Sequence, residues 1–350
     1  MTMDADALAR WNVAGHDAAV EGLATAVAAG RVSHAYLITG LEGVGRTTLA
    51  LALARALNCE AAPGQRPCNE CDACRRIVRH VHPDIVLADM QWQETVVGKS
   101  RGDQSRSRQR FSIDAIKWLR EDIVTRPILG RWKMQIIDDA GKFSTDAPEA
   151  FLKTLEEPPP YAVIVLIAES ADQVAETIRS RCRHIALGAV PASAIRAELI
   201  RRGVEGATAE RLSRGALGRV AWAVRMAEDP RALEKWREQV ETAFEHLTTP
   251  LGRITITGSL AREHTRKRDN TFELLDIWTG LWRDALLLHS GLPDQVSFPH
   301  LADRLEPFAQ RQDISGLYRA LWATQRAGSD LDHNVQARIA LHAMVMQWPD

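Results

Sequence analysis

A glycine-rich loop between an apolar run and a helical segment is the feature that most restricts the fold of this chain. The loop reads Gly40-Leu-Glu-Gly43-Val-Gly45-Arg46-Thr47; it follows residues 35–38 and precedes residues 49–57. In a phosphate loop of this type, backbone N–H groups surround phosphate oxygens, a lysine reaches the β and γ phosphates, and a hydroxyl holds Mg²⁺. The glycines and Thr47 are present here, but Arg46 stands at the lysine position.

Arg46 decides how this loop is interpreted. Arginine is bulkier than lysine and presents a planar fork instead of a compact charge. We therefore expect Arg46 to collide with the site that a lysine would serve. Two interpretations stay open: a degenerate loop retained for its shape, which the chemistry favours, and a working nucleotide site with an unusual residue.

A second strand ends in two acidic residues, Asp138 and Asp139. Asp138 stands where the Mg²⁺-binding acid of such a site belongs. A hydrolase usually has glutamate next, as the base for the attacking water, and the Asp139 side chain is one methylene shorter. Loss of hydrolysis explains both this change and Arg46; the alternative is a strand that simply ends in a solvated acidic turn.

Four cysteines follow the loop helix with the spacing C-x8-C-x2-C-x2-C: Cys59, Cys68, Cys71 and Cys74. This is ligand spacing for one tetrahedral zinc ion, and four protein thiolates leave no open position for catalysis. The alternative is a set of unliganded buried cysteines. Cys182 stands apart, and we expect it to be buried.

The first half of the chain alternates strand-like and helical patterns, which predicts an α/β domain with a mostly parallel sheet. Residues 92–110 are polar and basic and are interpreted as a solvated, mobile loop, with DNA contact as the minor alternative. The predicted strands span residues 35–39, 84–88, 133–138, 162–168 and 184–187; the predicted helices span 18–29, 47–58, 113–124, 147–156 and 171–179.

Strand patterns stop at Pro191, and the rest of the chain is predicted to be helical. A small unit is expected from helices at residues 192–202, 208–213 and 220–226. A longer helical section follows the Asp229-Pro230 break, and three- and four-residue spacing predicts one buried helix face. That face consists of Phe272, Leu275, Trp278, Trp282 and Leu286.

Composition and charge exclude several classes of protein. The formal net charge of −1 gives no general basic surface for nucleic acid, and no apolar run approaches the roughly 18 residues of a membrane-spanning helix. The acidic start lacks a secretion signal. We therefore expect a cytoplasmic protein without a membrane contact, in a reducing compartment where clustered cysteines bind metal more often than they form disulfides.

Several of these segments together resemble the delta-prime family of bacterial DNA polymerase III clamp loader subunits, which are AAA+ proteins. The resemblance is carried by residues 33–37, the phosphate loop, the four cysteines and His82-Pro83-Asp84. Residues 151–159 (Phe-Leu-Lys-Thr-Leu-Glu-Glu-Pro-Pro) resemble the most specific signature of the family, and residues 177–182 its Ser-Arg-Cys motif. The gamma/tau motor subunits share these blocks, but they carry an intact Gly-Lys-Thr loop and a strand that ends Asp-Glu.

The resemblance implies a three-part molecule. It comprises an AAA+ phosphate-loop core at residues 1–188 with a zinc module at 59–74, an all-α lid at 189–230, and an all-α collar for oligomerisation at 231–350. The core is expected to be a parallel sheet with flanking helices. By the family pattern, Arg181 completes the ATP site of a neighbouring subunit, where an arginine supplied in trans stabilises the transferring phosphoryl group.

The expected function is that of a non-motor accessory subunit of the DNA polymerase III holoenzyme. Its partners would be the gamma/tau and delta subunits and, through the complex, the sliding clamp and primer–template DNA. Zinc is the expected cofactor. Binding of ATP with Mg²⁺ by this chain stays open, as for the loop above, and ATPase activity of its own is not expected. The alternatives are a gamma/tau-like ATP-hydrolysing motor and a zinc-dependent DNA-binding module.

Overall fold

The computed structural model describes residues 5–97, 110–143, 147–264, 268–332 and 335–349. The chain divides into two compact units, the first formed by residues 1–195 and 218–221 and the second by residues 196–217 and 222–350. No helix in the described ranges is both long and apolar enough to cross a lipid bilayer.

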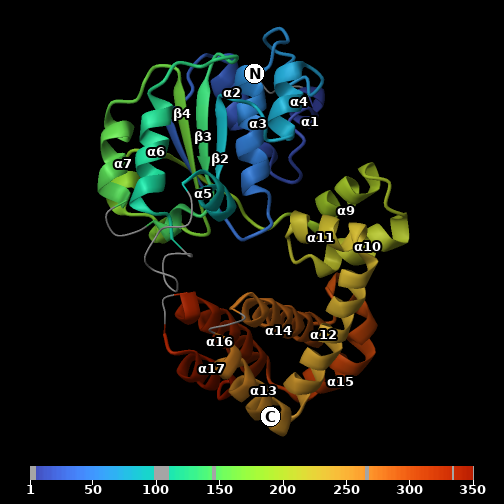
Figure 1. Ribbon diagram of the computed structural model, residues 1–350. Helices are drawn as coiled ribbons and strands as arrows, with labels where there is room; N and C mark the ends of the chain where they lie inside the picture. Colours follow the sequence, from blue (N-terminus) through green and yellow to red (C-terminus); the bar gives the residue numbers. More distant parts are fainter. Residues whose placement is uncertain (1–4, 98–109, 144–146, 265–267, 333–334, 350) are drawn as a thin grey trace. The chain divides into compact units, whose positions relative to one another are not determined.

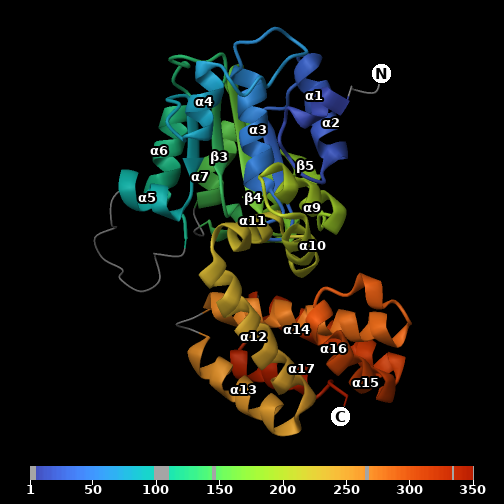
Figure 2. The same ribbon diagram turned by 90° about the vertical axis from the view of Figure 1, so that its right-hand side faces the viewer.

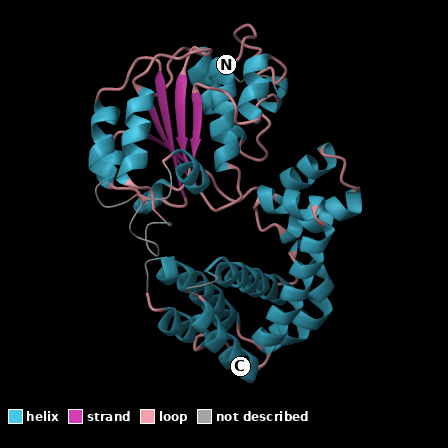
Figure 3. Cartoon of the chain, in the orientation of Figure 1, coloured by secondary structure: helices cyan, strands magenta, loops and turns pink. Residues whose placement is uncertain are grey.

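A five-stranded parallel sheet organises the first unit (Figures 1 and 3), which confirms the predicted α/β core. Each predicted strand is present, with ends that shift by no more than one residue. The order across the sheet is β2-β3-β4-β1-β5, so the first strand lies inside the sheet and β2 and β5 form its edges. The strands are β1 (Ala35–Thr39), β2 (Ile85–Ala88), β3 (Lys133–Ile137), β4 (Ala162–Ala168) and β5 (Arg183–Ala186).

Helices cover both faces of this sheet (Figure 2). Because successive strand residues point to opposite faces, Val163 and Val165 of β4 join a core with α2 and α3, whereas Ile164 and Leu166 join a core with α6 and α7. This double burial explains the continuous apolar strands. The helices are α1 (Ala5–Ala9), α2 (Asp17–Ala28), α3 (Arg46–Asn58), α4 (Asp72–Val78), α5 (Met90–Val96), α6 (Ile113–Ile123), α7 (Ala147–Glu156) and α8 (Glu176–Arg179).

Two predictions for this unit were wrong. The helix expected at residues 171–179 is split into a 3-10 turn at Ala171–Gln173 and the short α8, because Val174 is extended and inserts its buried side chain into the core. The loop expected at 92–110 begins inside α5, where the Asp89 carboxylate caps the helix and Trp92 packs edge-on against Trp118 at 5.2 Å. Residues 98–109, with Lys99, Arg101, Arg106 and Arg108, lie outside the described residues.

The second unit is helical, as predicted, and its core surrounds α14 (Arg268–His289). Leu275, Trp278 and Trp282 are buried, and Phe272 and Leu286 pack against them, which confirms the predicted helix face. The remaining helices are α9 (Ala192–Arg201), which begins in the first unit, α10 (Gly206–Gly215), α11 (Val220–Glu228), α12 (Pro230–Thr248), α13 (Pro250–Glu263), α15 (Ala302–Arg311), α16 (Ile314–Asp332) and α17 (Ala337–Val345). Division into core, lid and collar at residues 188 and 230 stays a prediction.

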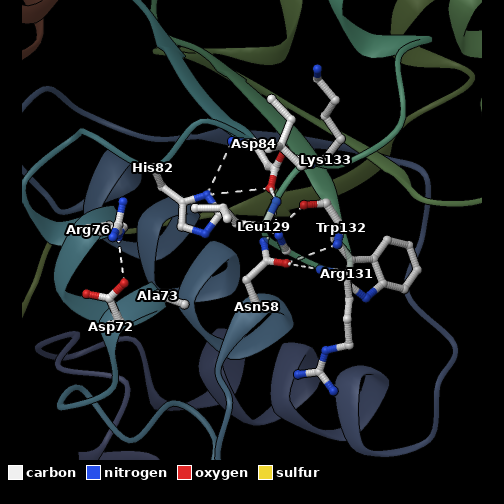
Figure 4. A network of polar contacts seen from close by, with 12 residues as sticks. Asn58, Asp72, Ala73, Arg76, His82, Asp84, Leu129, Arg131, Trp132 and Lys133 are labelled. Carbon is white, nitrogen blue, oxygen red and sulfur yellow. Dashed lines mark hydrogen bonds and ion pairs between the residues drawn. The ribbon is translucent and has the colours of Figure 1, made fainter.

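A clamped turn connects α6 to β3 (Figure 4). The buried Asp84 carboxylate accepts the backbone N–H groups of residues 128, 129 and 130 at 2.6, 2.8 and 2.6 Å. Asn58, the last residue of α3, accepts the N–H groups of residues 131 and 132, each at 2.9 Å, and donates to the Trp132 carbonyl. The side chains of Asp84 and Asn58 thus accept hydrogen bonds from the backbone N–H groups of residues 128–132 and attach this turn to the end of α3.

We expect Asp84→Asn to destabilise the first unit by about 2–4 kcal/mol at pH 7, because the amide leaves buried N–H donors without an acceptor. Burial alone would raise the pKa of Asp84, but the three N–H donors hold it below its ordinary value. The carboxylate therefore stabilises the fold above roughly pH 4 and loses this effect as the pH falls further, so the difference between variant and wild type should shrink in acid.

Urea unfolding at neutral and acidic pH measures this difference. The matched control is Asp114→Asn, which changes an exposed carboxylate paired with Lys117 and should shift stability by less than about 0.5 kcal/mol. An equal effect of the two substitutions would contradict the assigned role of Asp84.

Candidate functional site

The phosphate loop joins β1 to the N-terminus of α3, at the carboxyl end of the parallel strands. Gly40, Gly43 and Gly45 have φ values of 151°, 79° and 111°, in the region that side-chain-bearing residues rarely adopt. A Cβ on Gly40 would lie 2.4 Å from the Leu187 carbonyl oxygen. The loop therefore has the backbone that the glycines predict, at a helix N-terminus that favours anions.

Arg46 is folded into this loop. Its guanidinium donates a hydrogen bond to the Gly40 carbonyl at 2.8 Å, and only 7% of the residue is exposed. The side chain therefore fits without a clash by bonding to the loop backbone. In this position the cation is engaged by the loop itself and does not project beyond it.

Thr47 and Asp138 lie together, as expected for the two groups that hold Mg²⁺ in such sites. The Thr47 hydroxyl donates to Asp138 Oδ2 at 2.9 Å. Burial raises the pKa of Asp138, and the nearby Asp139 adds to this effect against the lowering by Thr47 and Arg46.

Asp139 does not join this pair. It has a positive φ of 64°, and its carboxylate forms an ion pair with Lys142 at 2.8 Å. The structure thus gathers Gly40, Gly43, Gly45, Arg46, Thr47 and Asp138 and directs the Asp139 carboxylate to another partner.

The four cysteines form a compact cluster between α3 and α4. The sulfur atoms of Cys59, Cys68, Cys71 and Cys74 all lie within 4.8 Å of one another, and the five described cysteines are free thiols. Tetrahedral coordination at about 2.3 Å brings thiolates to comparable separations. The cluster could therefore bind a metal ion, and its all-sulfur donor set is consistent with zinc.

Backbone N–H groups point at these sulfur atoms. The N–H of Cys68 donates to Cys59 Sγ, that of Cys71 to Cys68 Sγ, and that of Cys74 to Cys71 Sγ, at 3.3, 3.3 and 3.5 Å. Burial opposes ionisation of Cys68, yet backbone N–H groups and neighbouring thiols lower its pKa to about 7. Burial instead raises the pKa values of Cys59 and Cys74. The backbone N–H groups aimed at sulfur are therefore the feature that suits metal binding here.

Arg181 lies apart from these groups, between α8 and β5. Its guanidinium donates to the Thr177 carbonyl at 2.8 Å and forms an ion pair with Glu156 at 2.6 Å. The side chains of Arg181 and Glu156 are 36% and 50% exposed, so the pair is accessible to solvent. Cys182 is half-buried beside it, and burial raises its pKa to about 12.

Several contacting residues escaped the sequence reasoning. The Gly40 N–H donates to the Glu169 carbonyl at 3.1 Å, and the Ala221 N–H donates to the Gly43 carbonyl at 2.9 Å, so distant segments hold the loop. Arg55 and Arg131 contact the cysteine region through Asn69 and the Cys59 carbonyl. Arginine is frequent along the chain, and no local pattern distinguishes these residues.

A comparison with known protein families shows to which family the chain belongs. Residues 15–191, just over half of the chain, match the family described as DNA polymerase III, delta subunit. The chain belongs to this delta-subunit family. The match covers the sheet, the phosphate loop, the cysteine cluster and Arg181.

Curated relatives of this delta-family protein include DNA polymerase III subunit tau of Escherichia coli, 32% identical over 188 residues, and subunit tau of Bacillus subtilis, 32% identical over 184 residues. The alignments cover 54% and 53% of this chain but only 27% and 30% of the relatives. The chain thus matches less than a third of the length of these two proteins.

Similar solved structures include a DNA polymerase III gamma subunit-related protein from Thermotoga maritima and the Bacillus subtilis DNA clamp loader delta protein. The first is 19% identical with a TM-score of 0.37, covering 93% of this chain and 98% of the other. The second is 11% identical with a TM-score of 0.36 and the same coverage. These structural similarities are weak, and the family assignment rests on the sequence match.

Proposed function

We propose that this chain is a non-hydrolysing, delta-prime-like AAA+ subunit of the bacterial DNA polymerase III clamp loader. The observation that carries the proposal is the engagement of the phosphate loop by its own side chain, with Arg46 bonded to the Gly40 carbonyl. The Thr47–Asp138 hydrogen bond leaves the hydroxyl oxygen able to bind a cation, so the Arg46 contact is the one that opposes nucleotide binding. For its charge to reach a bound phosphate, Arg46 would have to leave the Gly40 carbonyl.

In this proposal the chain works with gamma/tau and delta subunits in the cytoplasm and helps them place the sliding clamp on primer–template DNA. Its contribution to ATP hydrolysis is Arg181, which would reach the nucleotide of a neighbouring subunit. The exposed position of the guanidinium supports this role, because exchange of a solvent-accessible carboxylate partner for a phosphate requires little energy.

The proposed collar has a suitable surface for association with other subunits. Ile314, Tyr318 and Trp322 recur every four residues on α16, and they are 55%, 63% and 52% exposed. Residues at this spacing share one helix face. Exposed apolar patches of this kind are typical of protein interfaces.

A structural zinc ion completes the proposal. Cys59, Cys68, Cys71 and Cys74 would hold it and fill its coordination sphere, so it would stabilise the module without taking part in a reaction.

A second candidate is an ATP-driven motor subunit like gamma/tau, which the identity to tau favours. It requires Mg²⁺-dependent ATP turnover by this chain that is lost when Asp138 is changed. The two candidates differ first in nucleotide affinity.

We expect the isolated chain to bind a fluorescent ATP analogue in the presence of Mg²⁺ with a Kd weaker than about 1 mM, corresponding to about −4 kcal/mol. Arg46→Lys should improve this affinity at least about tenfold, because lysine offers a compact charge in place of the guanidinium that bonds to Gly40. Fluorescence titration with unlabelled ATP as competitor measures both. Tight, competable binding by the wild-type chain would instead support the motor candidate.

A further inference from the structure

Arg55 is a buried cation at the C-terminal end of α3. It is 6% exposed; one terminal nitrogen donates to Asn69 Oδ1 at 3.0 Å and the other to the Trp11 carbonyl at 2.9 Å. Its Nε is buried and has no hydrogen-bond partner among the described residues. The guanidinium therefore lies in the interior with incomplete polar compensation.

No carboxylate balances this charge. Within the described ranges, Arg55 has no acidic residue at ion-pair distance, and its two hydrogen-bond acceptors are neutral oxygens. A guanidinium stays protonated in proteins, and an unpaired buried charge is strongly unfavourable. A negative partner nearby would therefore stabilise the folded chain.

The cysteine cluster supplies a candidate for this partner. Asn69, which accepts a hydrogen bond from the Arg55 guanidinium, lies between Cys68 and Cys71, and the Cys59 N–H donates to the Arg55 carbonyl oxygen at 2.8 Å. Four thiolates around one Zn²⁺ carry two net negative charges, but four neutral thiols carry none.

We propose that Arg55 is the counter-ion of the metal centre, and that its buried guanidinium balances the net negative charge of zinc bound by the four cysteines. The inference rests on the zinc site proposed above. Because Arg55 belongs to the helix that starts at the phosphate loop and also bonds to Trp11, the charge pairing ties the zinc module to the core of the first unit. Arg55 thus positions and neutralises the centre without coordinating it.

The test compares two variants. Arg55→Met removes the charge but has a side chain of similar length, whereas Arg55→Lys keeps the charge but lacks the two terminal nitrogens that donate to separate acceptors. Zinc content of the purified wild-type chain is measured first, followed by the rate of zinc transfer to a chromogenic chelator. Arg55→Met should release zinc about 10–100-fold faster than wild type, the usual effect of losing a residue that supports metal ligands. Arg55→Lys should restore most of the retention, and the control Arg75→Met, an exposed charge beside Cys74, should change little.

Thermal unfolding with and without zinc separates charge balance from ordinary packing. A counter-ion predicts that Arg55→Met lowers the Tm of the zinc-bound protein but lowers that of the metal-free protein much less, since only the bound form has a charge to balance. Equal Tm losses in both forms, or unchanged zinc release, would overturn the inference while leaving the zinc site intact. A wild-type chain without zinc would remove both the site and the counter-ion. If Arg55→Met does not fold, Arg55→Gln takes its place in the same comparison.

Discussion

Cys74→Ser is expected to lower zinc affinity more than about 100-fold and to unfold the module around residues 59–74, because a serine hydroxyl is not deprotonated at neutral pH and cannot replace a thiolate. Cys74 is fully buried and lies at the start of α4, so the loss also removes the order of that helix. The sheet has its own apolar cores on both faces and should stay folded.

Metal analysis of protein purified without chelators measures the first effect, and hydrogen exchange of residues 59–78 measures the second. Cys182→Ser is the matched control, since Cys182 lies outside the cluster and the variant should keep one zinc per chain. One tightly held zinc in Cys74→Ser would contradict the proposed ligand set.

Arg181→Ala is expected to leave the isolated chain as stable as wild type and to reduce ATP turnover by the reconstituted clamp loader. The ion pair with Glu156 is solvent-exposed, and such pairs contribute roughly 0–1 kcal/mol. At the one ATP site that Arg181 would complete, an arginine finger accounts for about 10³–10⁵ in kcat. The total ATP turnover of the complex should therefore fall by the fraction that this one site contributes.

The measurement is DNA- and clamp-stimulated ATPase activity of the assembled complex, together with a thermal unfolding curve of the free subunit. Arg179→Ala is a close control, because Arg179 lies two residues before Arg181, forms an ion pair with Asp172 and is similarly accessible. Turnover that stays at the wild-type level with Arg181→Ala, or that falls equally with Arg179→Ala, would remove Arg181 from its proposed role.

Local patterns predicted the elements of the fold well. Alternating apolar runs located all five strands, and the glycines at positions 40, 43 and 45 located the turn that leads into α3. The predictions failed where a single contact overrides the pattern. Val174 leaves a helical sequence because its side chain fills the core, and Asp89 starts a helix in a segment of polar composition.

The sequence by itself determined which groups are available: a phosphate loop with Arg46 in place of lysine, the Asp138-Asp139 pair, and four cysteines at metal-ligand spacing. Spacing along the chain is enough for these conclusions because glycine conformation, strand alternation and thiol clustering are local properties. Only the tertiary structure decided which partner each group meets. The contacts Arg46–Gly40, Thr47–Asp138, Arg55–Asn69 and Arg181–Glu156 depend on packing between strands and helices and on which charges become buried, and no local pattern encodes those.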